Sequence, residues 1–158
     1  MLGFLSGLVR TETPSRDAAA QEPLFDLLTK KLDGLDYTTI RVPGRRTGGY
    51  LYGRPQRRPP GQAAQLLVGH CDTVWAMGTL QEMPLRRTPE QLKGPGVYDM
   101  KAGLTQILFA LETIRRLELP LPVCPLVLIN ADEEIGSIES TQAIARLARI
   151  VERAYVLE

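Results

Sequence analysis

Side chains that can bind a metal or transfer a proton fall in three short segments of this 158-residue chain. They are His70–Val74 (HCDTV), Asp99–Lys101 (DMK) and Ala131–Gly136 (ADEEIG), and the last residue, Glu158, adds another carboxylate. His70 is the sole histidine. The available chemistry is therefore that of one imidazole and several carboxylates. The segments hold neither a serine–histidine pair for nucleophilic catalysis nor the clustered thiols of a zinc knuckle.

Carboxylates held close together repel one another unless they are protonated or neutralised by a cation. A divalent metal is the simplest such cation, and mixed ligation by His and Asp or Glu is typical of catalytic zinc. Two ions about 3.5–4 Å apart share a bridging carboxylate and a water whose pKa they lower. A carboxylate that binds no metal can then accept the proton of that water. Glu133 and Glu134 cannot both point the same way, so one can bind metal while the other faces the water.

Each segment also has a purely structural interpretation. A lone histidine at a strand end is most often a hydrogen-bonded structural residue, and adjacent acids are common in solvated turns or at helix N-termini. The glycines within 94–96 alone indicate no more than a turn. It is the recurrence of these groups after successive strands that favours a metal site.

Strands and helices that alternate from residue 65 onward must position these segments. Compact apolar runs at 65–69 and 125–130 predict buried strands, and 154–157 predicts a last strand. Apolar residues three and four apart predict helices over 102–119 and 141–150. Such alternation is typical of an α/β fold, a mainly parallel sheet with helices on its faces, in which sites form beyond the carboxyl ends of strands.

The first part of the chain predicts one helix and two paired strands. Four leucines between residues 24 and 32 form the apolar face of an amphipathic helix that Gly34 ends. Residues 37–42 are rich in β-branched side chains and predict a strand, with a shorter strand over 49–53 beside it. A basic, proline-rich loop over 54–63 follows.

Composition excludes several classes of protein. Hydrophobic residues make up 44% and charged residues 23%, an ordinary globular balance. The formal net charge of +1 provides no global field that favours nucleic acid or an anionic membrane. No apolar run reaches the roughly 20 residues of a membrane helix, and the apolar start reads poorly as a signal peptide. With only Cys71 and Cys124 as thiols, we expect a reducing, cytoplasmic location.

Three segments, His70–Val74, Gly94–Gly103 and Ala131–Ser137, resemble the signature blocks of the M20 metallopeptidase family in order and separation. That family includes glutamate carboxypeptidases, aminoacylases, acetylornithine deacetylase and succinyl-diaminopimelate desuccinylase. The likeness extends through nearly the whole chain, including Thr11–Ser15. It implies a three-layer αβα zinc-peptidase catalytic domain with a mainly parallel mixed sheet.

The resemblance also assigns a role to each polar residue. His70 would bind one zinc ion, Asp99 would bridge two ions, and Glu134 would bind the second. Glu133 would be the general base that activates the bridging water. Asp72 would orient His70 and raise its basicity, as metal-ligating imidazoles commonly require.

The same resemblance makes Glu158 a further ligand, on the ion that His70 binds. The family usually has a cis peptide directly after the bridging aspartate, here Asp99–Met100. The expected cofactor is Zn²⁺, two ions per complete site, with Co²⁺ or Mn²⁺ as alternatives. Cys71 lies between two site residues, so strand alternation points it away from the metal and into the core.

The implied activity is zinc-dependent hydrolysis of an amide or peptide bond in a small peptide or N-acyl amino acid. The segment Val74–Leu80 leans toward the glutamate carboxypeptidase-like branch. Family members are much longer, so we expect residues 1–158 to be the N-terminal part of the catalytic domain, with a sheet incomplete at its C-terminal side and little activity alone. The second metal-binding histidine, the substrate-binding Arg and Asn, and a lid domain that forms homodimers would lie elsewhere.

Two alternatives remain open. A truncated or degenerate domain that binds metal or a partner without catalysis is favoured by the single histidine and disfavoured by the intact motifs. Nucleic-acid binding through the arginines within 41–58 is the other, because such a patch can neutralise phosphates. A solvated basic loop explains those arginines better, and we expect no nucleic-acid partner and no membrane partner.

Overall fold

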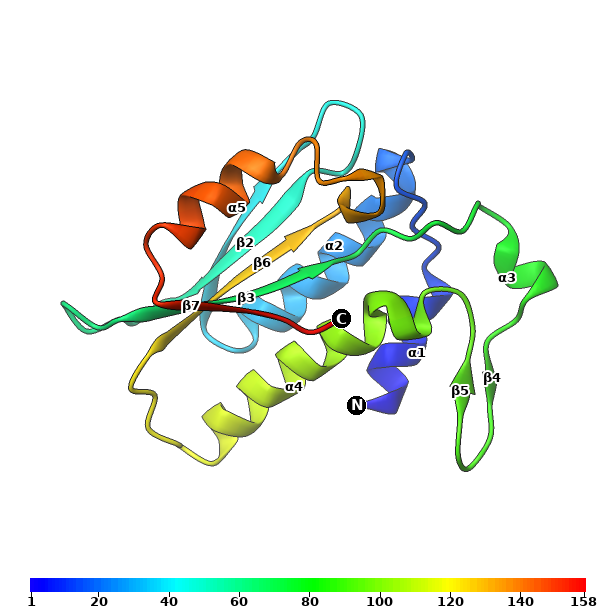
Figure 1. The fold of residues 1–158 in the computed structure, drawn as a ribbon. Helices are drawn as coiled ribbons and strands as arrows, with labels where there is room; N and C mark the ends of the chain where they lie inside the picture. Colours follow the sequence, from blue (N-terminus) through cyan, green and yellow to red (C-terminus); the bar gives the residue numbers. More distant parts are fainter.

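The computed structural model describes residues 1–158, which form three layers around a central sheet (Figure 1). The sheet has five strands in the order β1-β2-β6-β3-β7. Their bounds are Tyr37–Val42 for β1, Tyr50–Pro55 for β2, Ala64–His70 for β3, Cys124–Asn130 for β6 and Arg153–Val156 for β7.

Four of the five strands run in the same direction. Strand β3 is parallel to both β6 and β7, whereas β2 is antiparallel to both β1 and β6. The short loop between β1 and β2 permits only antiparallel pairing, while the long connection from β3 to β6 allows the crossover that parallel strands need. The mainly parallel mixed sheet expected from the sequence is confirmed.

Helices cover the two faces of the sheet unequally. One face carries α1 (Leu2–Arg10), α2 (Ala18–Asp33) and α4 (Gly103–Arg116), and the other carries α5 (Thr141–Ala148) (Figure 1). Strand β6 is buried along its whole length and sends alternate side chains to the two cores. Val127 and Ile129 pack with the leucines of α2 and α4, while Leu126 and Leu128 face the smaller core under α5.

Most predicted elements are confirmed, with differences at their ends. Helix α2 starts after Asp17, whose carboxylate accepts a hydrogen bond from the backbone N–H of Ala20 at 3.0 Å, and Gly34 caps its end. Leu27 is 40% exposed, so the apolar face of this helix is narrower than the four leucines predict. Helix α4 ends at Arg116, because Glu118 already has a positive φ of 50°.

Several short elements were not predicted. The apolar start forms α1, a four-residue helix α3 spans Thr79–Glu82, and β4 (Arg86–Arg87) pairs with β5 (Leu92–Lys93) in a hairpin that projects from the sheet (Figure 1). Two-residue strands carry too few side chains to display a period, so no sequence pattern indicates them. None of the helices is long and apolar enough to cross a membrane.

Candidate active site

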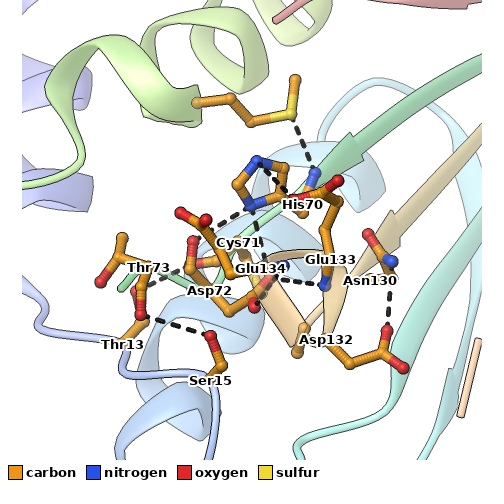
Figure 2. Close-up of polar contacts among 12 residues, drawn as sticks. Thr13, Ser15, His70, Cys71, Asp72, Thr73, Asn130, Asp132, Glu133 and Glu134 are labelled. Atoms are coloured by element: carbon orange, nitrogen blue, oxygen red, sulfur yellow. Dashed lines mark hydrogen bonds and ion pairs between the residues drawn. The ribbon is translucent and has the colours of Figure 1, made fainter. Parts of the chain in front are cut away.

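The site lies where β3 and β6 end side by side. In the parallel register of these strands His70 is opposite Asn130. Asp72 follows β3, and Glu133 and Glu134 follow β6, so these residues meet at the carboxyl edge of the sheet (Figure 2).

His70 is 1% exposed and its ring lies among three carboxylates. The Nε2 atom is 2.9 Å from Oδ1 of Asp99 and 3.9 Å from Oε2 of Glu133. On the other side of the ring, Nδ1 is 3.3 Å from Oδ1 of Asp72 and 3.1 Å from the Asp72 carbonyl oxygen. Asp72 thus holds one ring nitrogen and leaves the other facing the remaining carboxylates.

Five of the predicted site residues form one cluster. The ligand atoms of His70, Asp99 and Glu134 all lie within 4.8 Å of one another, and so do those of His70, Glu133 and Glu158. Glu158 comes two residues after β7, the strand that pairs with β3 on the side away from β6. Residues from four separate parts of the chain converge here, as the sequence analysis expects.

Burial and the neighbouring acids raise the pKa of two glutamates in this cluster. Burial, together with the charges of Glu158, Asp72 and Asp99, raises the pKa of Glu133, although His70 opposes this shift. Burial and the neighbouring charge of Asp99 likewise raise the pKa of Glu134. An imidazole amid crowded carboxylates, with ligand atoms this close, is a donor set that a divalent cation neutralises, so the residues present fit such an ion.

Opposing effects act on the imidazole. Burial alone would lower the pKa of His70, but the hydrogen bond to Asp72 and the charges of Asp72, Asp99 and Glu133 raise it to about 9. In the metal-free protein both ring nitrogens of His70 are therefore protonated at neutral pH. A metal ion must displace one of these protons before the ring can act as a ligand.

Asp72 also holds the turn that carries the two glutamates. It is fully buried, and its two carboxylate oxygens accept hydrogen bonds from the backbone N–H groups of Glu133 at 3.2 Å and Glu134 at 3.3 Å (Figure 2). One carboxylate thus positions the imidazole and both glutamates. The family resemblance implies only the contact with the imidazole, because contacts to backbone groups leave no side-chain signature in the sequence.

Asp132 was not singled out from the sequence, yet it is fully buried beside the glutamates. Its carboxylate accepts hydrogen bonds from the backbone N–H of Glu139 at 2.6 Å and from the N–H and hydroxyl of Ser140 at 3.1 and 2.6 Å. These bonds close the turn over 132–140. Gly136, within this turn, has a φ of 90°, a conformation that favours glycine. Its place in the segment Ala131–Gly136 is the signal that the sequence offers.

The loop before α4 places Asp99 against His70. The peptide bond Asp99–Met100 is cis, as the family resemblance implied. Gly96 has a φ of 65°, and a Cβ there would lie 2.7 Å from the Thr73 side chain, so glycine is required at this position. Cys71 is fully buried in the core with α2 and α4, which confirms that it points away from the site.

Comparisons with known proteins agree with this geometry. The chain has the αβα layers and the histidine–carboxylate cluster that the likeness to M20 metallopeptidases implies. The sequence profile described as "Peptidase family M20/M25/M40" matches residues 66–157, more than half of the chain. The chain therefore belongs to this peptidase family.

Individual relatives are considerably longer. Carboxypeptidase G2 of Pseudomonas sp. (strain RS-16) is 32% identical over 155 residues, which are 97% of this chain and 36% of that protein. An M20 family metallo-carboxypeptidase from Sulfolobus solfataricus superimposes with a TM-score of 0.81 at 16% identity, covering 99% of this chain and 36% of that one. Human carnosine dipeptidase 1 superimposes with a TM-score of 0.79 at 20% identity, covering 98% of this chain and 37% of that one. The chain spans little more than a third of each.

Proposed function

We propose that this chain forms the N-terminal part of the catalytic domain of a zinc-dependent hydrolase that cleaves an amide or peptide bond. The observation that carries the proposal is the convergence of His70, Asp99, Glu133, Glu134 and Glu158 in one cluster. The substrate would be a small peptide or an N-acyl amino acid, and the likeness to Carboxypeptidase G2 favours the carboxypeptidase branch.

The donor set suits two divalent ions. His70 and Glu158 would hold one ion, Glu134 a second, and Asp99 both. When bound, zinc supplies Lewis acidity that polarises the scissile carbonyl and lowers the pKa of water. Co²⁺ or Mn²⁺ would use the same donors. The family likeness implies a further histidine ligand, a substrate-binding Arg and Asn, and a lid domain that forms homodimers, and we place these outside residues 1–158.

Side chains of the protein would accept and donate the protons of the reaction. Glu133 is 44% exposed at its side chain, so it can reach solvent while its pKa is raised, as suits a general base at neutral pH. It would take a proton from the attacking water and give it to the leaving nitrogen. Asp72 accepts the Nδ1–H of His70, so once a metal ion displaces the second ring proton the Nε2 lone pair would be directed toward Asp99 and Glu133.

Replacing Glu133 by Gln in the full-length protein tests this assignment. Turnover of an N-acyl amino acid or a C-terminal glutamyl peptide should fall by at least about 100-fold, a typical contribution of a general base. Bound zinc, measured by elemental analysis, should stay nearly unchanged. Glu90→Gln, which alters an exposed glutamate in the β4–β5 turn, is the matched control.

Two results would contradict the proposal. Parallel loss of zinc in the Glu133 variant would make this residue a ligand rather than the base. Full-length wild-type protein that binds zinc but cleaves no such substrate would favour the competing interpretation, a non-catalytic metal-binding domain, which the single histidine of this chain supports.

A further inference from the structure

The segment Thr11–Ser15, here called the strap, offers no ligand to the cluster, yet it is bound tightly to the loops that do. It connects α1 to α2 and pairs with the chain just after β3 through a parallel bridge between Pro14 and Thr73. Thr13 is fully buried and Ser15 is 6% exposed, so these two side chains lie in the interior of the protein.

The strap is hydrogen-bonded to the residues immediately before and after Asp72, which are Cys71 and Thr73. The hydroxyl of Thr13 donates a hydrogen bond to the carbonyl oxygen of Cys71 at 2.7 Å, and the backbone N–H of Thr73 donates to the Thr13 carbonyl at 2.8 Å. The backbone N–H and hydroxyl of Ser15 reach the Thr73 carbonyl at 3.3 Å each. Figure 2 shows Thr13 and Ser15 beside Thr73, on the opposite side of the turn from Asn130.

Other contacts fix the strap in place. The buried ammonium of Lys101 donates to the Thr11 carbonyl at 2.8 Å and so caps the end of α1. The carboxylate of Glu12 accepts hydrogen bonds from the backbone N–H groups of Gly78 and Leu80, both at 2.8 Å. The strap is therefore anchored independently of the turn that it holds.

Gln21 adds a connection to the second strand end. It is fully buried, and its side-chain amide donates to the carbonyl oxygens of Pro14 at 2.9 Å and Ala131 at 3.1 Å. The segments after β3 and β6 are thereby joined through the strap and through Asp72. A shift of the strap would be transmitted to both.

We propose that Thr13 is a positioning residue for the metal centre. Its hydroxyl fixes the Cys71 peptide, which lies between His70 and Asp72, and so sets how the Asp72 carboxylate and carbonyl meet Nδ1 of the ring. This inference rests on the proposed function, because positioning matters only if His70 binds metal. Groups that orient a ligating histidine typically change metal affinity by 10- to 100-fold when they are lost.

Thr13→Val tests the proposal, because valine keeps the shape of threonine and removes only the hydroxyl. Thr13→Ser restores the hydroxyl and serves as the rescue. Tyr37→Phe is the matched control: it also removes a buried hydroxyl that donates to a carbonyl, that of Pro125 at 3.0 Å, at the opposite end of the sheet.

Two readouts are measured on the 158-residue chain. The first is the affinity for Co²⁺, followed through its visible absorption. The second is the low-field proton resonance of the Nδ1–H of His70 in the metal-free protein; the chain has one histidine, so nitrogen-edited spectra need only separate this proton from the Nε2–H of the same ring. Thr13→Val should weaken Co²⁺ binding about tenfold and shift or broaden this resonance. Thr13→Ser and Tyr37→Phe should leave both readouts near wild type.

The proposal is overturned if Thr13→Val matches wild type in both readouts, or if Tyr37→Phe weakens Co²⁺ binding equally, since the effect would then be one of general stability. Failure of the proposed function is distinguishable: wild-type chain that binds no Co²⁺ contradicts the metal centre. In that case an unchanged Nδ1–H resonance in Thr13→Val would still refute the positioning role.

Discussion

The Asp72 carboxylate contacts His70 and the backbone of both Glu133 and Glu134, so its replacement should disturb the whole cluster. Asp72→Asn keeps the volume but removes the charge and one acceptor oxygen. We expect Co²⁺ or Zn²⁺ affinity to fall by about 10- to 100-fold, measured by competition with a chromogenic chelator. Asp17→Asn, at the start of α2, changes a capping carboxylate outside the cluster and should leave affinity unchanged.

The protonation of His70 gives metal binding a pH dependence. Its pKa of about 9 in the metal-free chain lies above the ordinary value of 6.5, so the ring is charged at neutral pH. Because the ligating ring must be neutral, apparent metal affinity should rise about tenfold per pH unit at neutral pH and level off above pH 9. Calorimetry in two buffers of different ionisation enthalpy should show one proton released from His70. Affinity independent of pH would contradict this.

The same raised pKa predicts how the stability of the metal-free chain changes with pH. A group whose pKa is higher in the folded state stabilises the fold fully below its unfolded value near 6.5, and this contribution disappears as pH rises through about 9. Urea unfolding of the wild-type chain should therefore show a loss of stability over this range. His70→Asn should show a smaller loss, and equal slopes would be inconsistent with the shifted pKa.

Residues with intrinsic metal or proton chemistry were predictable from the sequence, because their types are rare enough in combination to stand out. Asp132, Gln21 and Thr13 were not. Their partners are backbone N–H and carbonyl groups contributed by distant segments, and nothing in a linear pattern shows which backbone groups the fold leaves without partners.

At the scale of elements, Asp132 connects the end of β6 to the start of α5. Asp132→Ala would leave buried donors of Glu139 and Ser140 without an acceptor. We expect a loss of about 2–3 kcal/mol in the free energy of unfolding, measured by urea denaturation. Asp17→Ala removes an ordinary helix cap and should cost about 1 kcal/mol. A smaller loss for Asp132→Ala than for Asp17→Ala would contradict this role.

Strands β3 and β6 form where continuous apolar runs predict them, because helices cover both faces of the sheet there. Strands β1 and β2 form where β-branched and aromatic residues predict them. The ends of α4 and α5 were overestimated, since apolar residues such as Leu117 and Ile150 continue the helical spacing but remain 64% exposed. Spacing alone does not distinguish a side chain that reaches the core from one that misses it.

Across the whole molecule, one exposed apolar edge is the outer strand of the sheet. Strand β7 pairs only with β3, and its Tyr155 and Val156 are 46% and 61% exposed. Unpaired apolar edges template association with other chains. We expect the 158-residue chain to self-associate with rising concentration in analytical ultracentrifugation, and Val156→Lys to reduce this. Equal association of both proteins would place the contact elsewhere.

The central claim is that residues far apart in the sequence converge to hold metal at the carboxyl edge of the sheet. Crystals of the chain soaked with Zn²⁺ and measured at the zinc absorption edge test it most directly. The account predicts anomalous density among His70, Asp99, Glu134 and Glu158. Anomalous density confined to other surfaces, or none at saturating zinc, would contradict it.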